Sequence, residues 1–273
     1  MIKFKCTLLE IQGMYLFTKE EIIYLANNIY EEALRANTYW ELIKQYHTNV
    51  DKYNSEMNYS PAFYQVIYTA LVESLFLNLA KIYDVDENSI TIKTLLKSLE
   101  AITVNDLDDY VKSKYELLNN KFQHQLKPNE ECFFKEQVWE QKRICELLEV
   151  EYTYTIVDLN LEQLYDLYIK KFHSLNSIRD NLITQRNKIY VHNDKATNFK
   201  FEAIYQNQAI NDTAIDKLID YALDLSRYII DILTGTLKAD TYINMDDWEA
   251  TLMLVKVGHK YQMNHMDEML TEE

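Results

Sequence analysis

Glycine and proline are scarce in this chain of 273 residues, which contains three glycines and two prolines. At average usage a chain of this length would hold roughly 19 glycines and 14 prolines. Sheet proteins rely on glycine for their tight turns and bulges, so the scarcity favours long helices and few turns. A glycine-rich phosphate loop is also excluded, because neither GxGxxG nor GxxxxGK[ST] occurs. We therefore expect an all-α fold.

Cysteine and long apolar runs are also scarce. Cys6, Cys132 and Cys145 are widely spaced and form no CxxC pair, so neither a disulfide framework nor a zinc site is indicated. Residues 1–17 are too short and too interrupted by polar residues for a signal sequence. No uninterrupted apolar run approaches the roughly 20 residues of a membrane span. We expect a cytoplasmic protein that needs no metal or other cofactor and does not associate with a membrane.

Positive charge is concentrated in one part of an otherwise acidic chain, whose net charge is −15. Residues 169–200 hold seven lysines and arginines against two aspartates, which gives this window +5 and leaves −20 for the rest. A net negative charge disfavours binding to phosphate, so an RNA surface is expected only in this window. The alternative is a solvated basic helix face without a ligand.

Capping signals and apolar periodicity predict a helical bundle in a single domain, 1–273, with its core at roughly 30–235. A short C-terminal helix and an acidic tail are expected in 236–273. The segment after Pro61 is apolar on most sides and is predicted to be a central, buried helix. The predicted helices are 18–58 with a break near Asn37, 61–83, one from Thr91, one from Asn105, 130–149, 160–192 with a break near 174–177, 213–234, and one from Asp246.

The stretch "ITQRNKIYVHNDK", residues 183–195, breaks the apolar pattern of its helix. On a helical wheel with Leu182 at zero, Arg186 falls at about 40° and Arg179 at about 60°, inside the apolar arc, and His192 falls at about 280°, just outside it. A buried arginine costs several kcal/mol unless its donors are satisfied. Such a break marks either a functional site or an arginine that binds a buried carboxylate or lies at a protein interface.

The bare Arg-x5-His spacing carries little information, since five arginines and six histidines produce such a pair by chance about one time in three. In its helical and basic context, however, "QRNKIYVHND" resembles the Arg-x(4–6)-His motif of HEPN domains, and more specifically of AbiU2-type HEPN proteins of bacterial phage defence. "YWEL" (39–42) and "LNLAKIYD" (77–84) resemble upstream helical segments of such proteins. Asp194 stands where HEPN toxins controlled by a nucleotidyltransferase often carry a tyrosine, so control by that route is not expected.

The resemblance implies an all-α, HEPN-like helical bundle with additional helices, a homodimer, and metal-independent RNA cleavage in active members. His192 would be the acid/base, because imidazole transfers protons near neutral pH. Arg186 would bind the phosphate, and Asn187 would hold phosphate or orient the imidazole. RNA contacts are expected from the remaining side chains of the window, namely Arg179, Lys188, Tyr190 and Lys195.

The spacing of Arg186 and His192 on a helix suggests that a second copy of the chain completes the site. On an ideal helix, Arg186 and His192 are about 120° and about 9 Å apart, so they converge only through a helix irregularity or a partner subunit. We therefore predict a homodimer through the face formed by residues 175–192, with an antitoxin or other protein as a further partner. One alternative is a catalytically inactive HEPN-like module that binds protein or nucleotide. Another is an unrelated all-α scaffold in which both arginines form buried salt bridges.

Overall fold

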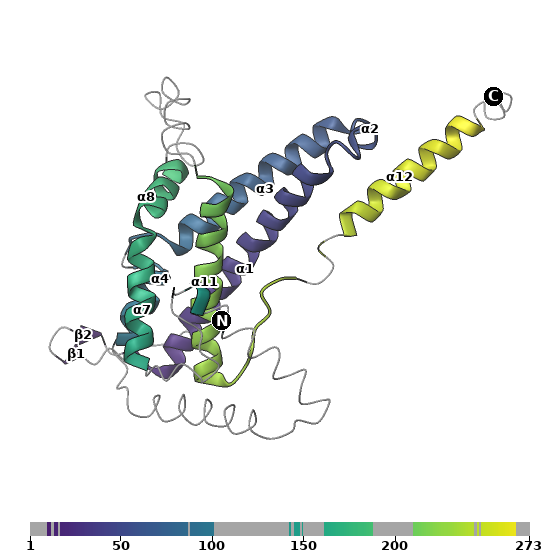
Figure 1. Cartoon of the computed structure of the whole chain (residues 1–273). Coiled ribbons are helices and arrows are strands. Elements are labelled where there is room, and N and C mark those ends of the chain that lie inside the picture. Colours follow the sequence, from purple (N-terminus) through teal and green to yellow (C-terminus); the bar gives the residue numbers. More distant parts are fainter. Residues whose placement is uncertain are drawn as a thin grey trace, which may run out of the picture.

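The structure is a computed structural model (Figure 1), and it describes residues 10–11, 14–15, 17–86, 88–100, 142, 145–147, 149, 161–187, 210–242, 245 and 247–265. Its helices are α1 (Lys19–Asn49), α2 (Asn54–Met57), α3 (Pro61–Ile82), α4 (Ile92–Glu100), α7 (Leu161–Ser174), α8 (Asn176–Gln185), α11 (Asp212–Thr234) and α12 (Asp247–Asn264). A two-residue antiparallel ladder joins β1 (Glu10–Ile11) to β2 (Met14–Tyr15). Apart from this ladder the described elements are helices, so the predicted all-α fold is confirmed.

Helix α1 begins at the predicted capping box. The Thr18 hydroxyl accepts a hydrogen bond from the Glu21 amide, and the Glu21 carboxylate accepts one from the Thr18 amide. The predicted break near Asn37 is wrong, because α1 continues to Asn49. The Asn37 side chain instead donates to the Asp240 carbonyl at 2.9 Å, which ties the helix to the segment after α11.

The main core lies where α1, α3 and α11 pack together, with α4, α7 and α8 completing it (Figure 1). Helix α11 begins and ends where the sequence predicts. The Asn211 side chain accepts from the Ala214 amide at its start, and Gly235 ends it with φ 68° in the left-handed region. Its apolar face is buried almost along its whole length, so α11 is a central helix of the bundle.

Helix α3 differs from the prediction of a central, buried helix. Its C-terminal half is buried through Leu75, Phe76 and Leu79, whereas Phe63 and Val66 in its N-terminal half are 59% and 67% exposed. Apolar composition on all sides does not specify which sides the same chain covers. By length and composition alone α3, with a mean hydropathy of 1.3 over its most apolar window, is also sufficient to cross a membrane.

Helices α7 and α8 follow one another along one side of the bundle (Figure 1). The predicted break falls at Leu175, where the Leu175 amide donates to the Phe172 carbonyl and the chain turns before α8 begins. The break lies four residues before Arg179, and therefore sets the position of the first of the two arginines on the apolar arc.

Helix α12 confirms the short C-terminal helix and packs on a second, small apolar cluster. Leu252 is fully buried against Tyr53 and Met57, and the Trp248 indole donates to the Gln45 side chain. From there α12 extends away from the bundle (Figure 1). The helices predicted from Asn105 and over most of 130–149, and the acidic tail beyond residue 265, lie outside the described residues. The division of the chain into one domain stays a prediction.

Candidate functional site

Arg186 lies at the end of α8, where two residues of wider, π-helical turn follow Gln185. Its guanidinium donates through Nη1 to Asp84 Oδ2 at 2.6 Å, and the two side chains are 20% and 23% exposed. Asp84 follows the C-terminal end of α3, so the ion pair joins two elements that are 102 residues apart in the sequence. Short π-helical turns in α-helices are frequent at functional sites.

Asn187 fixes the guanidinium from the other direction. Its side-chain oxygen accepts a hydrogen bond from Arg186 Nε at 2.9 Å. Within the described part of the chain, Arg186 Nη2 has no hydrogen-bond partner, so one edge of the guanidinium remains open. Asn187 thus orients the arginine here, whereas the sequence predicted that it would hold phosphate or orient the imidazole.

Asp84 is ionised at neutral pH and anchors the pair. Partial burial by itself would raise the pKa of the Asp84 carboxyl, but hydrogen bonds from Arg186 and from the Val85 amide outweigh burial, so its pKa lies below the usual value. The Val85 amide binds Oδ1 at 2.7 Å and Arg186 binds Oδ2, so each carboxylate oxygen has its own donor. This arrangement holds the arginine in one orientation at low conformational cost.

Sequence reasoning did not identify Asp84. The segment "LNLAKIYD" that supports the family resemblance ends on this residue, and the wheel indicated that a carboxylate could satisfy Arg186. Nothing in the sequence, however, selects Asp84 from the 43 acidic residues of the chain. Two observations together could have predicted Asp84 as the partner of Arg186. One is the arginine on the apolar arc, and the other is the acidic residue at the end of the segment "LNLAKIYD".

Arg179 lies inside the protein. Its guanidinium carbon is 3.7 Å from the centroid of the Phe172 ring, and Nη1 donates to the Phe172 carbonyl at 3.2 Å and to Asn176 Oδ1 at 2.8 Å. The residue is 9% exposed, and burial lowers the pKa of its guanidinium. This placement favours a structural role at the α7–α8 break over the predicted RNA contact, since its bound donors point into the chain.

The described part of the apolar arc, residues 175–187, packs within one chain. Leu175 and Leu182 are 2% and 0% exposed in the main core, and Ile178 and Ile183 pack partly buried against it. None of the large apolar side chains exposed in the described residues belongs to α8. In the described residues 175–187 the arc therefore presents no exposed large apolar side chain, and the dimer through the 175–192 face stays a prediction.

The other residues predicted for the site lie outside the described residues, namely His192, Lys188, Tyr190 and Lys195. Their roles stay predictions. The described part of the site consists of Arg186 with its two orienting partners, Asp84 and Asn187. Among the described residues these three groups present an oriented cation with one terminal nitrogen unpartnered, which suits the recognition of a phosphate.

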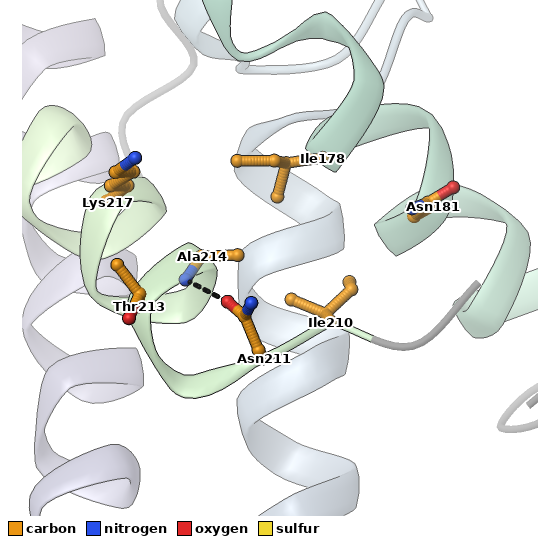
Figure 2. A pocket seen from close by; sticks show the side chains of 7 residues that line it. All are labelled: Ile178, Asn181, Ile210, Asn211, Thr213, Ala214 and Lys217. Carbon is orange, nitrogen blue, oxygen red and sulfur yellow. Dashed lines mark hydrogen bonds between the residues drawn. The ribbon is translucent and has the colours of Figure 1, made fainter. Parts of the chain in front are cut away.

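A cavity of about 380 Å³ lies between α8 and the start of α11 (Figure 2). Its lining includes Asn181 from α8 and Thr213 and Lys217 from the first turns of α11, none of which was predicted as a site residue. The Asn211 side chain at its edge already accepts from the Ala214 amide, as the dashed line in Figure 2 marks. The cavity does not include Arg186 or Asp84, so it is a separate feature from the ion pair.

Comparison with known proteins agrees with the helical arrangement. A protein-family model described as AbiU2, of the HEPN type, matches residues 19–251, which run from the start of α1 into α12 and include Asp84 and the whole of the "QRNKIYVHND" segment. No curated protein matches the chain, and no solved structure matches it.

Proposed function

Because the chain belongs to the AbiU2 family of HEPN proteins, we propose that it is a metal-independent endoribonuclease acting in phage defence or as a toxin. The observation that carries this proposal is the state of Arg186, whose guanidinium is partly exposed and oriented by Asp84 and Asn187. Arg179, in contrast, is enclosed by the Phe172 ring, the Phe172 carbonyl and the Asn176 side chain. Family membership excludes the alternative of an unrelated scaffold.

The proposed reaction uses a nucleophile that RNA itself carries. The 2′-hydroxyl attacks the adjacent phosphorus, the P–O5′ bond breaks, and the products are a 2′,3′-cyclic phosphate and a free 5′-hydroxyl. His192 takes the proton from the nucleophile or gives one to the leaving oxygen. The open edge of Arg186 donates to the phosphoryl oxygens as their negative charge grows.

Asp84 and Asn187 act as positioning residues in this scheme, because they bind the arginine and not the substrate. A guanidinium whose orientation is fixed before substrate arrives needs little reorganisation as charge develops. The ion pair also partly neutralises Arg186, so long-range attraction of RNA falls to the other basic residues of the window, including Lys188 and Lys195.

We further propose that the protein acts in the cytoplasm as a homodimer, with an antitoxin or other protein as a possible regulator. The wide spacing of the three cysteines, which form no CxxC pair, supports the compartment. The 9 Å offset between Arg186 and His192 on an ideal helix supports either the local π-turn or a second copy as the means of bringing the motif together.

The first prediction concerns the histidine. Purified protein should cleave single-stranded RNA in the presence of EDTA, and the products should end in a 2′,3′-cyclic phosphate. His192→Ala should lower the rate by roughly 10²- to 10⁴-fold, the usual contribution of a general acid or base. The measurement is single-turnover cleavage of a labelled RNA, with circular dichroism to verify that the variant is folded.

His259→Ala is the matched control, since His259 lies on α12 against the Tyr59 ring and away from Arg186. It should cleave at the wild-type rate. Equal cleavage by wild type and His192→Ala would trace the activity to another site or to a contaminant.

A second candidate function is a catalytically inactive module that binds protein or nucleotide. The ion pair itself favours it, because Asp84 already satisfies one terminal nitrogen of Arg186 without any substrate. If folded wild-type protein cleaves no RNA, this alternative replaces the nuclease. The assay for it is binding of nucleotides and single-stranded RNA by wild type and by Arg186→Ala.

A further inference from the structure

The N-terminal half of α3 is uncharged and is covered only in part by the rest of the described chain. No charged residue occurs in the segment 57–72. The exposed positions in 61–70 cover an arc of about 240° around the helix, at roughly 100° per residue. Among them, Phe63, Val66 and Ile67 are 59%, 67% and 37% exposed. The uncovered surface of this half is therefore broad, apolar and free of charge.

Helix α12 presents an exposed apolar face that is flanked by lysines. Leu254, Val257 and Tyr261 are 73%, 66% and 61% exposed, and they follow one another at intervals of three and four residues. The opposite face of α12 packs on the small apolar cluster of its own chain, so these side chains face away from the bundle. On a helical wheel, Lys256 and Lys260 fall along one flank of the exposed face.

The two apolar regions lie at the same end of the molecule. The rings of Tyr59 and His259 meet edge to face with centroids 5.2 Å apart, and Tyr64 of α3 packs on the same small cluster as Leu252 of α12. The first turns of α3 therefore adjoin the middle of α12 at the end of the α1–α3 pair. Figure 1 shows α12 extending outward from that end.

Together the two regions expose more apolar area than a soluble chain usually does. Their large apolar side chains, Tyr59, Phe63, Val66, Ile67, Met253, Leu254, Val257 and Tyr261, are between 37% and 73% exposed. At roughly 150 Å² for a whole side chain of this size, they expose on the order of 700 Å². The largest apolar patch of a typical monomer is about 300–600 Å², and larger patches mark sites that contact a protein or a membrane.

We propose that this end of the molecule binds the surface of an anionic phospholipid membrane, with the first half of α3 and the exposed face of α12 inserted among the headgroups. The charges agree, because residues 250–264 of α12 contain Lys256 and Lys260 and no acidic residue. Lysines at the edge of an apolar face extend their stems along it and hold their ammonium groups at the level of the lipid phosphates. The cytoplasmic leaflet, which is negatively charged, attracts them.

The net charge of −15 does not oppose this orientation strongly. Salt screens charges that are more than roughly 10 Å apart, so the lysines on the binding surface act more strongly on lipid than acidic residues elsewhere on the chain. Glu249, at the start of α12, is paired with Lys52 at 2.5 Å. Glu73 is exposed and is the first charged residue after the segment 57–72, so it marks the limit of insertion along α3.

A helix of a partner protein fits the surface less well than lipid does. A helix that packs against one other element usually buries a stripe of roughly 100°. The exposed arc of the first half of α3 is about 240° wide, so a single partner helix would leave much of it in water. Headgroups and acyl chains surround an inserted helix on all of its uncovered sides.

Helix α3 lies at the membrane surface in this proposal and does not cross the bilayer, although its length and composition would allow it. Its C-terminal half is buried in the main core through Leu75, Phe76 and Leu79. The uncharged part that remains, residues 61–72, is about 18 Å long, whereas the hydrocarbon core is about 30 Å thick. Helices that are apolar on one side and basic on the other bind in the headgroup region.

Membrane binding at this surface departs from the expectation that the chain does not associate with a membrane. That expectation was based on the lack of a spanning apolar run, and surface binding needs no such run. The surface contains none of the residues assigned to the nuclease, so the proposal does not rest on the proposed function. Lipid binding is measured without RNA, and loss of lipid binding and loss of cleavage are therefore separate results.

The test is flotation of the purified full chain with phospholipid vesicles of two compositions, phosphatidylcholine alone and phosphatidylcholine with phosphatidylglycerol. Wild type should float with the anionic vesicles and more weakly with the neutral ones, and the difference should shrink as salt is raised. Val66→Glu and Leu254→Glu each place a negative charge in the inserted surface and should lower the partition coefficient at least about 10-fold. The two side chains are 67% and 73% exposed, so both variants should fold, as circular dichroism can verify.

The lysines are tested separately from the apolar side chains. Changing both Lys256→Gln and Lys260→Gln should lower partitioning into the anionic vesicles by roughly 5-fold per lysine, the usual contribution of a basic residue near a charged membrane. Partitioning into the neutral vesicles should be unchanged. Equal flotation of wild type with the two kinds of vesicle would overturn the proposed preference for anionic lipid.

Two controls accompany these variants. Val66→Leu keeps the surface apolar and should float as wild type does. Tyr24→Glu changes an aromatic side chain that is 61% exposed near the opposite end of α1, and it should leave flotation unchanged. A wild type that stays in the soluble fraction with both kinds of vesicle, or flotation that survives Val66→Glu and Leu254→Glu, overturns the proposal. If these variants instead change the molar mass in light scattering and wild type does not float, the surface belongs to a protein contact.

Discussion

Two arginines seven residues apart on one helix have different surroundings. Arg179 is enclosed by a ring, a carbonyl and an amide oxygen from α7 and from the start of its own helix. Arg186 reaches an aspartate across the bundle, and its Nη2 has no partner among the described residues. A wheel treats the two as equivalent because they lie about 20° apart. The break at Leu175 and the π-turn after Gln185 separate their roles.

Asp84→Asn tests the positioning of Arg186. The amide keeps the size of the side chain but removes the charge-assisted bond, so unfolding free energy should fall by roughly 1–2 kcal/mol. If the protein is a nuclease, its cleavage rate should fall as well, with little change in RNA affinity, since Asp84 does not contact substrate. Urea denaturation and single-turnover kinetics measure the two effects. Asp51→Asn, an exposed aspartate, should change neither.

The stability difference between wild type and Asp84→Asn should depend on pH in a defined direction. The pKa of Asp84 in the folded chain lies below its ordinary value of 3.8. The contribution of the ionised carboxylate is therefore complete well above that ordinary value and disappears as the pH falls through the lower, folded pKa. Urea midpoints of the two proteins should differ at neutral pH and converge on acidification. A difference that grows on acidification would contradict this assignment.

At the scale of the element, Arg179 holds α7 and α8 together at their break. Arg179→Ala leaves the Phe172 carbonyl and the Asn176 side chain without their donor and exposes the Phe172 ring. Unfolding free energy should fall by roughly 2–4 kcal/mol. Arg179→Lys should restore little of the lost unfolding free energy. The lysine ammonium cannot stack on the Phe172 ring, and it lacks the planar set of donors that a guanidinium offers to two acceptors. RNA affinity of the folded fraction should be unchanged, and a selective loss of RNA binding would restore Arg179 as an RNA contact.

Glycine-to-alanine substitutions at Gly235 and Gly258 should change stability in opposite directions, because one glycine ends a helix and the other lies inside one. Gly235 ends α11 with a positive φ of 68°, whereas Gly258 lies within α12 with open space where a Cβ would be. Gly235→Ala should destabilise the fold by about 1 kcal/mol, the cost of the left-handed conformation for an L-residue. Gly258→Ala should instead raise the helicity of α12, by up to about 1 kcal/mol of helix propensity. Thermal unfolding followed by circular dichroism distinguishes the two signs.

At the scale of the whole molecule, local signals predicted the ends of helices well and tertiary partners poorly. Thr18 and Glu21, Asn211 and Gly235 act on backbone groups within four residues, so the sequence contains all that decides them. The exposure of the N-terminal half of α3 depends on which other helices cover it, and an apolar sequence is the same whether it is covered or not. The partner of Arg186 is decided by how α3 and α8 meet, which no local pattern encodes.

The ion pair between Asp84 and Arg186 also has a consequence for the order in which the protein is made. A ribosome adds Asp84 102 residues before Arg186, an interval of roughly 5–20 seconds at ordinary rates of synthesis. Until then a nascent chain has neither the guanidinium nor His192, and a product truncated anywhere in between cannot orient one. If the protein is the proposed toxin, incomplete chains that end between Asp84 and Arg186 should therefore have no nuclease activity in the cell that makes them.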